Sequence, residues 1–290
     1  MNMKFLKALV VLMVISLPFI YGYNVYTRGS WELAKQVTPL GQLPSQVNES
    51  SGLAKAAEPG MYFTHNDHGA GGAPAVLFKV NESGKLIKSY TISGATNEDW
   101  EDLTGDNNGH VYIADTGNNN GKRTDLKVYK VSAANPGRAE VISFSYDDKP
   151  EAGKSKKGKK AKKPVTSFDS EAIFWNNGNL YLVTKDRNNS NEARLYKLPD
   201  SPGDHTAQLV ATKPMNEKIT GAGLSPDGKQ LVLMSVGKLH IFQVSGSNYF
   251  NGNPQTISLG NVGQTEGLVF KDSNTLIFTN EGGQIFQYNF

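Results

Sequence analysis

Residues 265–288 read TEGLVFKDSNTLIFTNEGGQIFQY and contain three short apolar runs separated by turn formers. Glu266-Gly-Leu268 opens the first run, Leu276-Ile-Phe-Thr279 forms the second and Gln284-Ile-Phe-Gln-Tyr288 forms the third. Short runs rich in β-branched and aromatic residues between such turns are typical of strands rather than helices. This stretch therefore predicts a small antiparallel sheet.

The same opening phrase occurs at four earlier positions along the chain. They are Ser51-Gly-Leu53, Glu101-Asp-Leu103, Glu171-Ala-Ile173 and Ala222-Gly-Leu224. A second apolar run is centred nine or ten residues after each phrase, and a third run follows it. Successive phrases are 44–51 residues apart, apart from one interval of 70 that contains a lysine-rich insert. Repeats of several short strands with a period of this length indicate the blades of a β-propeller.

We predict an all-β fold, namely a five-bladed β-propeller closed by an N-terminal strand, with six blades as the alternative count. The last repeat supplies only three runs, so its outer edge would stay open. The unclaimed segment Gln36–Leu43 is compatible with a strand, and Pro39 within it is tolerated on an outermost strand. We therefore expect Gln36–Leu43 to pair beside Gln284–Asn289. An unrelated β-sandwich would not explain five matching registers.

Residues 1–30 are predicted to be a signal peptide or an N-terminal membrane anchor, and residues 31–290 the propeller domain. Lys4 and Lys7 precede the apolar run Ala8–Ile20, which is short for a ~20-residue transmembrane helix. Ile20-Tyr-Gly22 is a weak cleavage signal, so both interpretations stay open. Either one predicts an exported protein that is periplasmic or secreted, or anchored to the inner membrane.

The formal net charge of +3 misrepresents the body of the protein, because seven lysines lie between Lys154 and Lys163. Without this insert, which forms a predicted lysine-rich loop over residues 150–164, the chain would be acidic. The loop is either a solvated segment or an arm that binds a polyanion or anionic lipid. No specific nucleic-acid binding follows from the overall charge. We expect a monomer, and the absence of cysteine excludes disulfides and thiolate chemistry.

Propeller geometry should bring the starts of the innermost strands and the ends of the second strands together at one channel mouth. The ligand or channel-mouth candidates at these positions are Glu101, Asp102, Asp115, Glu171, Lys185, Glu266, Asn280 and His65, with Asp67 and Asp169 beside them. Carboxylates gathered in this way repel one another unless a cation or a raised pKa compensates. Hard oxygen ligands suit Ca²⁺, so the predicted metal ligands are Glu101, Glu171, Glu266 and Asp115.

Two less specific interpretations of these residues stay open. The acids can be ordinary turn and channel residues that accept hydrogen bonds from backbone N–H groups. His65 and His68 are three residues apart in an expected loop, which is a weak metal-binding signal.

Several of these phrases resemble motifs of extracytoplasmic bacterial β-propellers. The phrases are Asp99-Trp-Glu-Asp-Leu103, Tyr112-Ile-Ala-Asp-Thr-Gly-Asn118, Asp169-Ser-Glu-Ala-Ile173 and Thr265-Glu-Gly-Leu268. They look like those of the SdiA-regulated proteins and the phytase-like and esterase-like propellers, over most of residues 49–290. The resemblance implies a secreted or periplasmic propeller whose blade-start glutamates face the channel and in which calcium is bound. Ser51 and Ala222 depart from the acidic pattern.

Two functions remain open at this point. The first is a binding or scaffold module of the cell envelope that contacts a protein, glycan or small-molecule ligand. The second is a calcium-dependent hydrolase of phosphoester or lactone substrates, with Asp115, His65 or Lys185 as the activating group. Phosphoester binding would favour arginines near the mouth, such as Arg123 and Arg187. We favour the binding module from sequence, because a propeller fold by itself indicates no chemistry.

Overall fold

The structure is a computed structural model that describes residues 33–67, 73–148, 168–185 and 191–290. All regular elements of this part of the chain are β-strands. Their bounds are β1 Val37–Gln42, β2 Ser50–Lys55, β3 Met61–Asn66, β4 Val76–Asn81, β5 Leu86–Thr91, β6 Trp100–Gly105, β7 His110–Asp115, β8 Lys127–Ser132, β9 Glu140–Tyr146, β10 Ser170–Asn176, β11 Asn179–Thr184, β12 Glu192–Pro199, β13 Gly203–Pro214, β14 Ile219–Leu224, β15 Gln230–Ser235, β16 Lys238–Gln243, β17 Gln255–Ser258, β18 Thr265–Asp272, β19 Thr275–Asn280 and β20 Gln284–Asn289.

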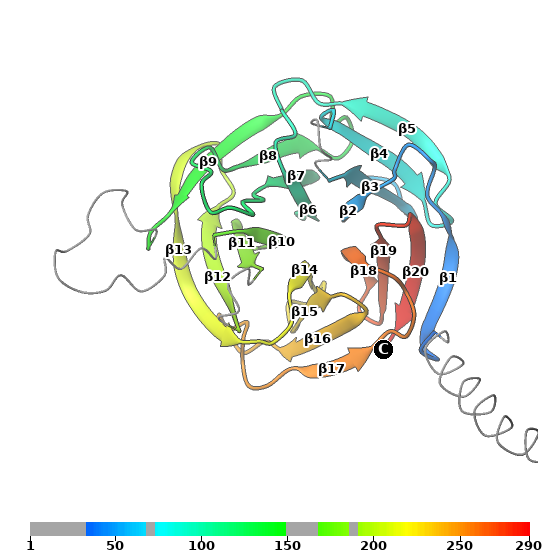
Figure 1. The fold of residues 1–290 in the computed structure, drawn as a ribbon. Coiled ribbons are helices and arrows are strands. Elements are labelled where there is room, and N and C mark those ends of the chain that lie inside the picture. The colour runs from blue at the N-terminus through cyan, green and yellow to red at the C-terminus, as the bar shows by residue number, and fades with distance from the viewer. Residues whose placement is uncertain (1–32, 68–72, 149–167, 186–190) are drawn as a thin grey trace, which may run out of the picture.

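The strands form four sheets that are arranged around a central axis (Figure 1). Three sheets have four strands, in the orders β2-β3-β4-β5, β14-β15-β16-β17 and β1-β20-β19-β18. In the last of these, β1 pairs antiparallel with β20, with Val37 opposite Tyr288. The predicted pairing of the N-terminal segment with the C-terminal strand is therefore confirmed, and the two segments lie side by side in Figure 1.

The fourth sheet has eight strands and differs from the separate blades predicted from sequence. Its order is β10-β11-β12-β13-β9-β8-β7-β6. The junction is made by β13, a strand of 12 residues. Its first part, from Gly203 to Ala207, pairs parallel with β9, and its second part pairs antiparallel with β12. One long outer strand thus joins two four-stranded units that would otherwise present separate edges.

The innermost strands β2, β6, β10, β14 and β18 form a closed ring in which each contacts the next. Small residues allow these backbones to approach closely. A Cβ added to Gly52 on β2 would lie 2.6 Å from the backbone nitrogen of Leu103 on β6. A Cβ added to Gly267 on β18 would lie 2.7 Å from the carbonyl carbon of Gly52. The core lies between adjacent sheets, where apolar side chains such as Phe63, Phe174 and Phe278 are buried.

Every innermost strand is irregular near its start. Register shifts occur between Ser50 and Leu53, Trp100 and Leu103, Ser170 and Ala172, Ile219 and Gly221, and Thr265 and Leu268. Such bulges redirect side chains and are common next to functional sites. The predicted glutamates of the channel mouth lie within these bulges, so their directions could not follow from strand alternation.

Two predictions concern residues outside the described part of the chain. They are the targeting segment, residues 1–30, and the lysine-rich loop, residues 150–164; the roles suggested for His68 and Arg187 also lie outside the described residues. Among the described residues, there is no helix of the length and apolarity that crossing a membrane requires.

Candidate functional site

A cluster of carboxylates surrounds Glu101 at one mouth of the ring. Ligand oxygens of Asp67, Asp99 and Glu101 all lie within 4.8 Å of one another, and so do those of Glu101, Asp169 and Glu171. Glu101 belongs to both groups of three and is thus the hub of the cluster. It is 4% exposed, and Asp169 and Glu171 are also buried. We call these five residues the acidic cluster.

Electrostatics in the acidic cluster disfavour full ionisation. Burial raises the pKa of Glu101 well above its ordinary value, and the neighbouring charge of Glu171 raises it further. Asp67, Asp99 and Asp169 act in the same direction. Like charges held this close in a poorly solvated site require protons or a cation to balance them.

Lys185 supplies the positive charge on one side of the cluster. Its ammonium donates a hydrogen bond to Glu171 at 2.6 Å, and the lysine side chain is 13% exposed. Glu266, at the start of β18, lies near the same pair. The pKa of Glu266 is raised to about 8, mainly by burial. The positive charge of Lys185 lowers this pKa, and the negative charge of Glu171 raises it. Gln264 donates to Glu266 at 3.2 Å. Glu266 therefore holds a proton near neutral pH.

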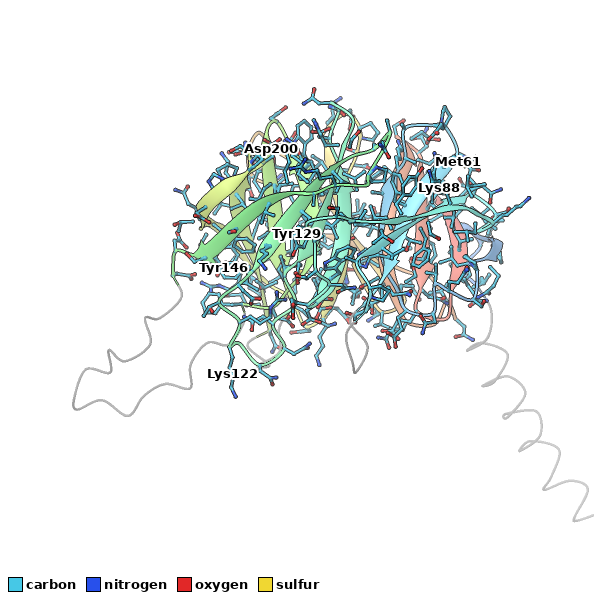
Figure 2. The ribbon with its side chains drawn as sticks, turned by 90° about the horizontal axis from the view of Figure 1, so that it is seen from above. Met61, Lys88, Lys122, Tyr129, Tyr146 and Asp200 are labelled. Carbon is cyan, nitrogen blue, oxygen red and sulfur yellow. The ribbon has the colours of Figure 1, made fainter. Side chains whose placement is uncertain are left out.

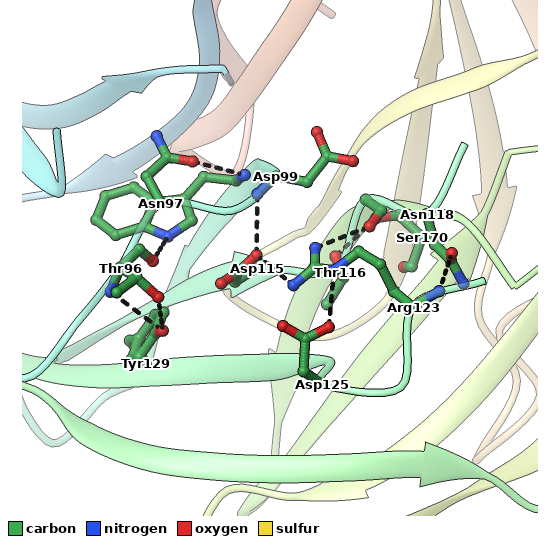
Figure 3. A network of polar contacts seen from close by, with 12 residues as sticks. Thr96, Asn97, Asp99, Asp115, Thr116, Asn118, Arg123, Asp125, Tyr129 and Ser170 are labelled. Atoms are coloured by element: carbon green, nitrogen blue, oxygen red, sulfur yellow. Dashed lines mark hydrogen bonds and ion pairs between the residues drawn. The ribbon is translucent and has the colours of Figure 1, made fainter. Parts of the chain in front are cut away.

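Asp115 and Arg123 form a second polar network beside the cluster (Figure 3). The guanidinium of Arg123 lies 2.9 Å from Asp115 Oδ1 and 3.2 Å from Asp125 Oδ1, and it donates to the Gly117 carbonyl at 2.8 Å. Asp115 Oδ1 also accepts from the backbone N–H of Asp99 at 3.1 Å. Asp115 thus positions Asp99 and the loop between β7 and β8 rather than joining the cluster.

The same loop holds Asp169 in place. The backbone N–H of Asn118 donates to Asp169 Oδ1 at 2.5 Å, and the Asn118 amide donates to the Phe168 carbonyl at 3.2 Å. Thr116 donates to the Ser170 carbonyl at 2.7 Å. These bonds connect the end of β7 to the start of β10. They explain how acids from the two four-stranded units of the eight-stranded sheet come close to each other.

The acidic cluster fits a hard divalent cation. Its possible ligands are all carboxylate oxygens, which Ca²⁺ prefers. Gly117 leaves the space that these oxygens occupy, since an added Cβ would lie 2.1 Å from Glu101 Oε1 and 2.4 Å from Asp99 Oδ2. A side chain at this position would force both carboxylates to shift from these places.

Replacing Gly117 by alanine should therefore disrupt the cluster. We expect calcium affinity to fall at least tenfold, because the new methyl group would displace Glu101 and Asp99. Gly137→Ala is the matched control, since an added Cβ there meets no atom closer than 3.8 Å. Isothermal titration with calcium chloride measures both variants. Equal affinities would show that these two carboxylates do not bind the ion.

The structure separates the predicted site residues into two sets. Glu101 and Glu171 lie in the acidic cluster with Lys185 beside them, and Glu266 is close enough to sense both charges. Among the described residues, the two groups of three include neither Glu266 nor Asp115. The predicted set of metal ligands therefore differs from the observed grouping, because Asp115 is engaged by Arg123.

Three other candidates have structural contacts instead. Asn280 donates to the Val262 carbonyl at 2.7 Å and accepts from the Gln284 N–H at 2.8 Å, so it holds its own loop. His65 is fully buried against Trp100, at a ring-centroid distance of 5.5 Å, and burial lowers the pKa of His65 to about 4. Asp102 is also fully buried and accepts hydrogen bonds from backbone N–H groups.

Asp99 is the member of the cluster that our sequence reasoning missed. It precedes Trp100 at the start of β6 and does not occupy the register of the other blade-start acids. The phrase Asp99-Trp-Glu-Asp with three acids in four residues was the available signal. Asp99 and Glu101 are two residues apart, so an extended chain directs both side chains to the same side, and their carboxylate oxygens lie within 4.8 Å of each other.

Comparison with known proteins adds information on the fold. No family model matches the chain, and no curated protein matches its sequence. The PQQ-bound form of an aldose sugar dehydrogenase from Streptomyces coelicolor has a TM-score of 0.51 and 13% identity, covering 87% of this chain and 97% of that chain. A gluconolactonase from Xanthomonas campestris has a TM-score of 0.51 and 11% identity, covering 87% of this chain and 89% of that chain. The chain thus has a β-propeller-like fold, whereas the narrower family resemblance stays a prediction.

Proposed function

We propose that this protein is a divalent-cation-dependent hydrolase of a lactone substrate, acting at the acidic cluster. The observation that carries the proposal is the position of the buried residue Glu101. Its carboxylate oxygens lie within 4.8 Å of those of two pairs of acids, Asp67 with Asp99 and Asp169 with Glu171. The two structural neighbours are enzymes, and one of them is a gluconolactonase. This reverses the preference for a binding or scaffold module that the sequence alone suggested.

The residues of the cluster have distinct expected roles. Glu101 would hold a cation such as Ca²⁺ together with acids of one or both groups. When bound, such an ion polarises a substrate carbonyl. Glu266, whose pKa is about 8, can donate or accept a proton near neutral pH, as general acid–base chemistry requires. Lys185 neutralises Glu171 and supplies a positive charge at the edge of the site.

The other predicted activating groups are less suitable. Asp115 is engaged by Arg123 and by the Asp99 N–H. His65 is fully buried, so a substrate at the mouth could not reach it. Lys185 is paired with Glu171, so Glu266 is the group whose pKa best suits proton transfer in this site.

The contacts of Arg123 favour a lactone over a phosphoester. Recognition of a phosphate usually uses an arginine with donors free to form two parallel hydrogen bonds. The guanidinium of Arg123 instead contacts Asp115, Asp125 and the Gly117 carbonyl. Using it for a substrate would break the network that positions Asp99.

Two further expectations belong to the same proposal. We propose five blades; the closed ring of five innermost strands and the division of the eight-stranded sheet at β13 into two four-stranded units support this number. Export to the periplasm or cell surface is proposed from the composition of residues 1–30.

Hydrolysis of sugar lactones tests the proposed function. We expect purified protein with calcium or manganese to open glucono-δ-lactone faster than the spontaneous reaction, and a chelator to remove that activity. Glu101→Gln should lower kcat/KM at least a hundredfold, because it removes the carboxylate shared by both groups. Glu140→Gln, at an exposed position, is the matched control. Release of acid is followed with a pH indicator over a panel of lactones and p-nitrophenyl phosphate.

Two results would count against the proposal. Absence of lactone opening with any divalent ion would return the protein to the class of binding modules. Cleavage of the phosphoester alone would identify the substrate class as phosphoester.

A further inference from the structure

The far ends of the innermost strands surround a second concave site. A cavity of about 310 Å³ lies there, lined by residues of β2, β6, β10, β14 and β18 and of the turns that follow them. The acidic cluster lies at the starts of the same strands, so the two sites are at opposite mouths of the ring. Figure 2 shows both faces: Met61 and Asp200 lie at the cavity face, whereas Lys122, on the loop between β7 and β8, lies at the other.

The wall of this cavity is apolar in part. Trp175, Leu224 and Val269 line it with half-buried side chains, whereas the leucine and phenylalanine side chains beneath them, such as Leu53 and Phe174, are buried in the core. A volume of about 310 Å³ is at the lower end of the range for small-molecule sites, which is roughly 300–1,000 Å³. The cavity therefore suits a small molecule with an apolar body.

The charged groups at the rim differ in how far a ligand can reach them. The titratable residues that line the cavity are Lys55, Asp106 and His110. The hydrogen-bonding capacity of the Asp106 carboxylate is used within the protein. It accepts from the backbone N–H groups of Asn108 and His110, both at 2.8 Å. It also contacts His110 Nδ1 at 2.8 Å and accepts from the Tyr112 hydroxyl at 3.0 Å. Its side chain is 1% exposed.

Lys55 is the charge available to a ligand. It is exposed and, within the described residues, has no ion pair within 4.0 Å. Burial of part of the side chain lowers its pKa, and the charge of Asp272 partly offsets this effect. Asp272 itself is exposed at the end of β18, where solvent screens it. A ligand carboxylate beside Lys55 would therefore meet a partly desolvated cation without displacing a protein partner.

We propose that this second mouth binds a small monocarboxylate whose apolar chain lies on Trp175, Leu224 and Val269 and whose carboxylate pairs with Lys55. The inference is independent of the proposed hydrolase activity, because no residue of the cavity belongs to the acidic cluster. The proposed ligand site lies at the mouth of the ring opposite the acidic cluster.

Alanine methyl NMR tests this site directly, with hexanoate as the probe and hexanol as its uncharged counterpart. Ala56, Ala57, Ala133 and Ala222 line the cavity, whereas Ala193 and Ala207 lie elsewhere. We expect hexanoate to shift the first set saturably, with a dissociation constant on the order of 1 mM. Hexanol should bind about fivefold more weakly, as one partly exposed ion pair predicts.

Paired lysine variants separate the specific site from general attraction of an anion. Lys55→Gln should weaken hexanoate binding about fivefold and leave hexanol unchanged. Lys85→Gln, which removes an exposed lysine outside the cavity, should leave both affinities unchanged. The proposal is overturned if hexanol binds as well as hexanoate, if the two variants respond alike, or if the reference alanines shift with the cavity alanines.

Discussion

Replacing Asp102 by alanine is expected to lower the free energy of unfolding by about 3 kcal/mol or more, since each buried donor left without an acceptor costs about 1–3 kcal/mol. The Asp102 carboxylate is fully buried and accepts from three backbone N–H groups. They are those of Leu103 at 2.7 Å, Ile173 at 3.0 Å and Ala222 at 3.4 Å. These residues belong to β6, β10 and β14, so one carboxyl group ties three innermost strands together.

The measurement is thermal or urea unfolding, in which a loss of that size corresponds to roughly 6–12 °C in Tm for a chain of this length. Asp102→Asn should give a smaller loss, because the amide keeps one oxygen acceptor but turns an NH₂ group toward the backbone donors. Asp204→Ala, at an exposed position of β13, should change the free energy of unfolding by no more than about 0.5 kcal/mol. A Tm for Asp102→Ala within two or so degrees of wild type would mean that apolar packing alone holds the ring.

Calcium is expected to stabilise the protein, and the effect should grow with pH. Without a cation, Glu266 binds an extra proton in the folded state between its ordinary pKa of 4.5 and its folded pKa of about 8. Its contribution to stability is thus fully present below the lower value and is lost as pH rises through the higher one. Burial raises the pKa of Glu101 as well, so it acts with the same sign. A bound divalent ion compensates the negative charge that ionisation creates.

We therefore expect Tm in chelator to fall between pH 6 and pH 9, and calcium to remove most of that fall. Calcium at a hundredfold excess over its dissociation constant adds about 2.7 kcal/mol by mass action. That amounts to roughly 5–10 °C in Tm.

Glu101→Gln should abolish the response, and Glu171→Gln should blunt it, because Glu171 belongs to one group of three and Glu101 to both. Glu140→Gln, at an exposed position, should respond as wild type does. If millimolar calcium leaves the wild-type transition unmoved at pH 8.5, the acids have a structural role only.

The strands themselves were determined by the sequence. The apolar run Leu231–Met234 lies within β15, and Leu276–Thr279 lies within β19. Local pattern is sufficient here, because side chains of an extended chain alternate and turn formers limit each run. Closure by residues 36–43 also followed from sequence, because an unpaired edge of the last sheet demands a partner. The number of separate sheets did not, since the parallel pairing of β13 with β9 depends on how two outer strands meet in space.

The sequence also predicted that acidic residues gather at one mouth of the ring. The role of each acidic residue there was decided by the tertiary structure. Glu101 and Asp102 are neighbours in the chain, yet one is the hub of the acidic cluster and the other ties together the three strands β6, β10 and β14. Neighbouring side chains of a strand point to opposite sides, but the bulge between Trp100 and Leu103 shifts the register, so sequence position does not say which of the two faces the mouth. Contacts from other strands and loops then assign Asp115 to Arg123 and bring Asp169 to Glu101, and no spacing along the chain encodes those contacts.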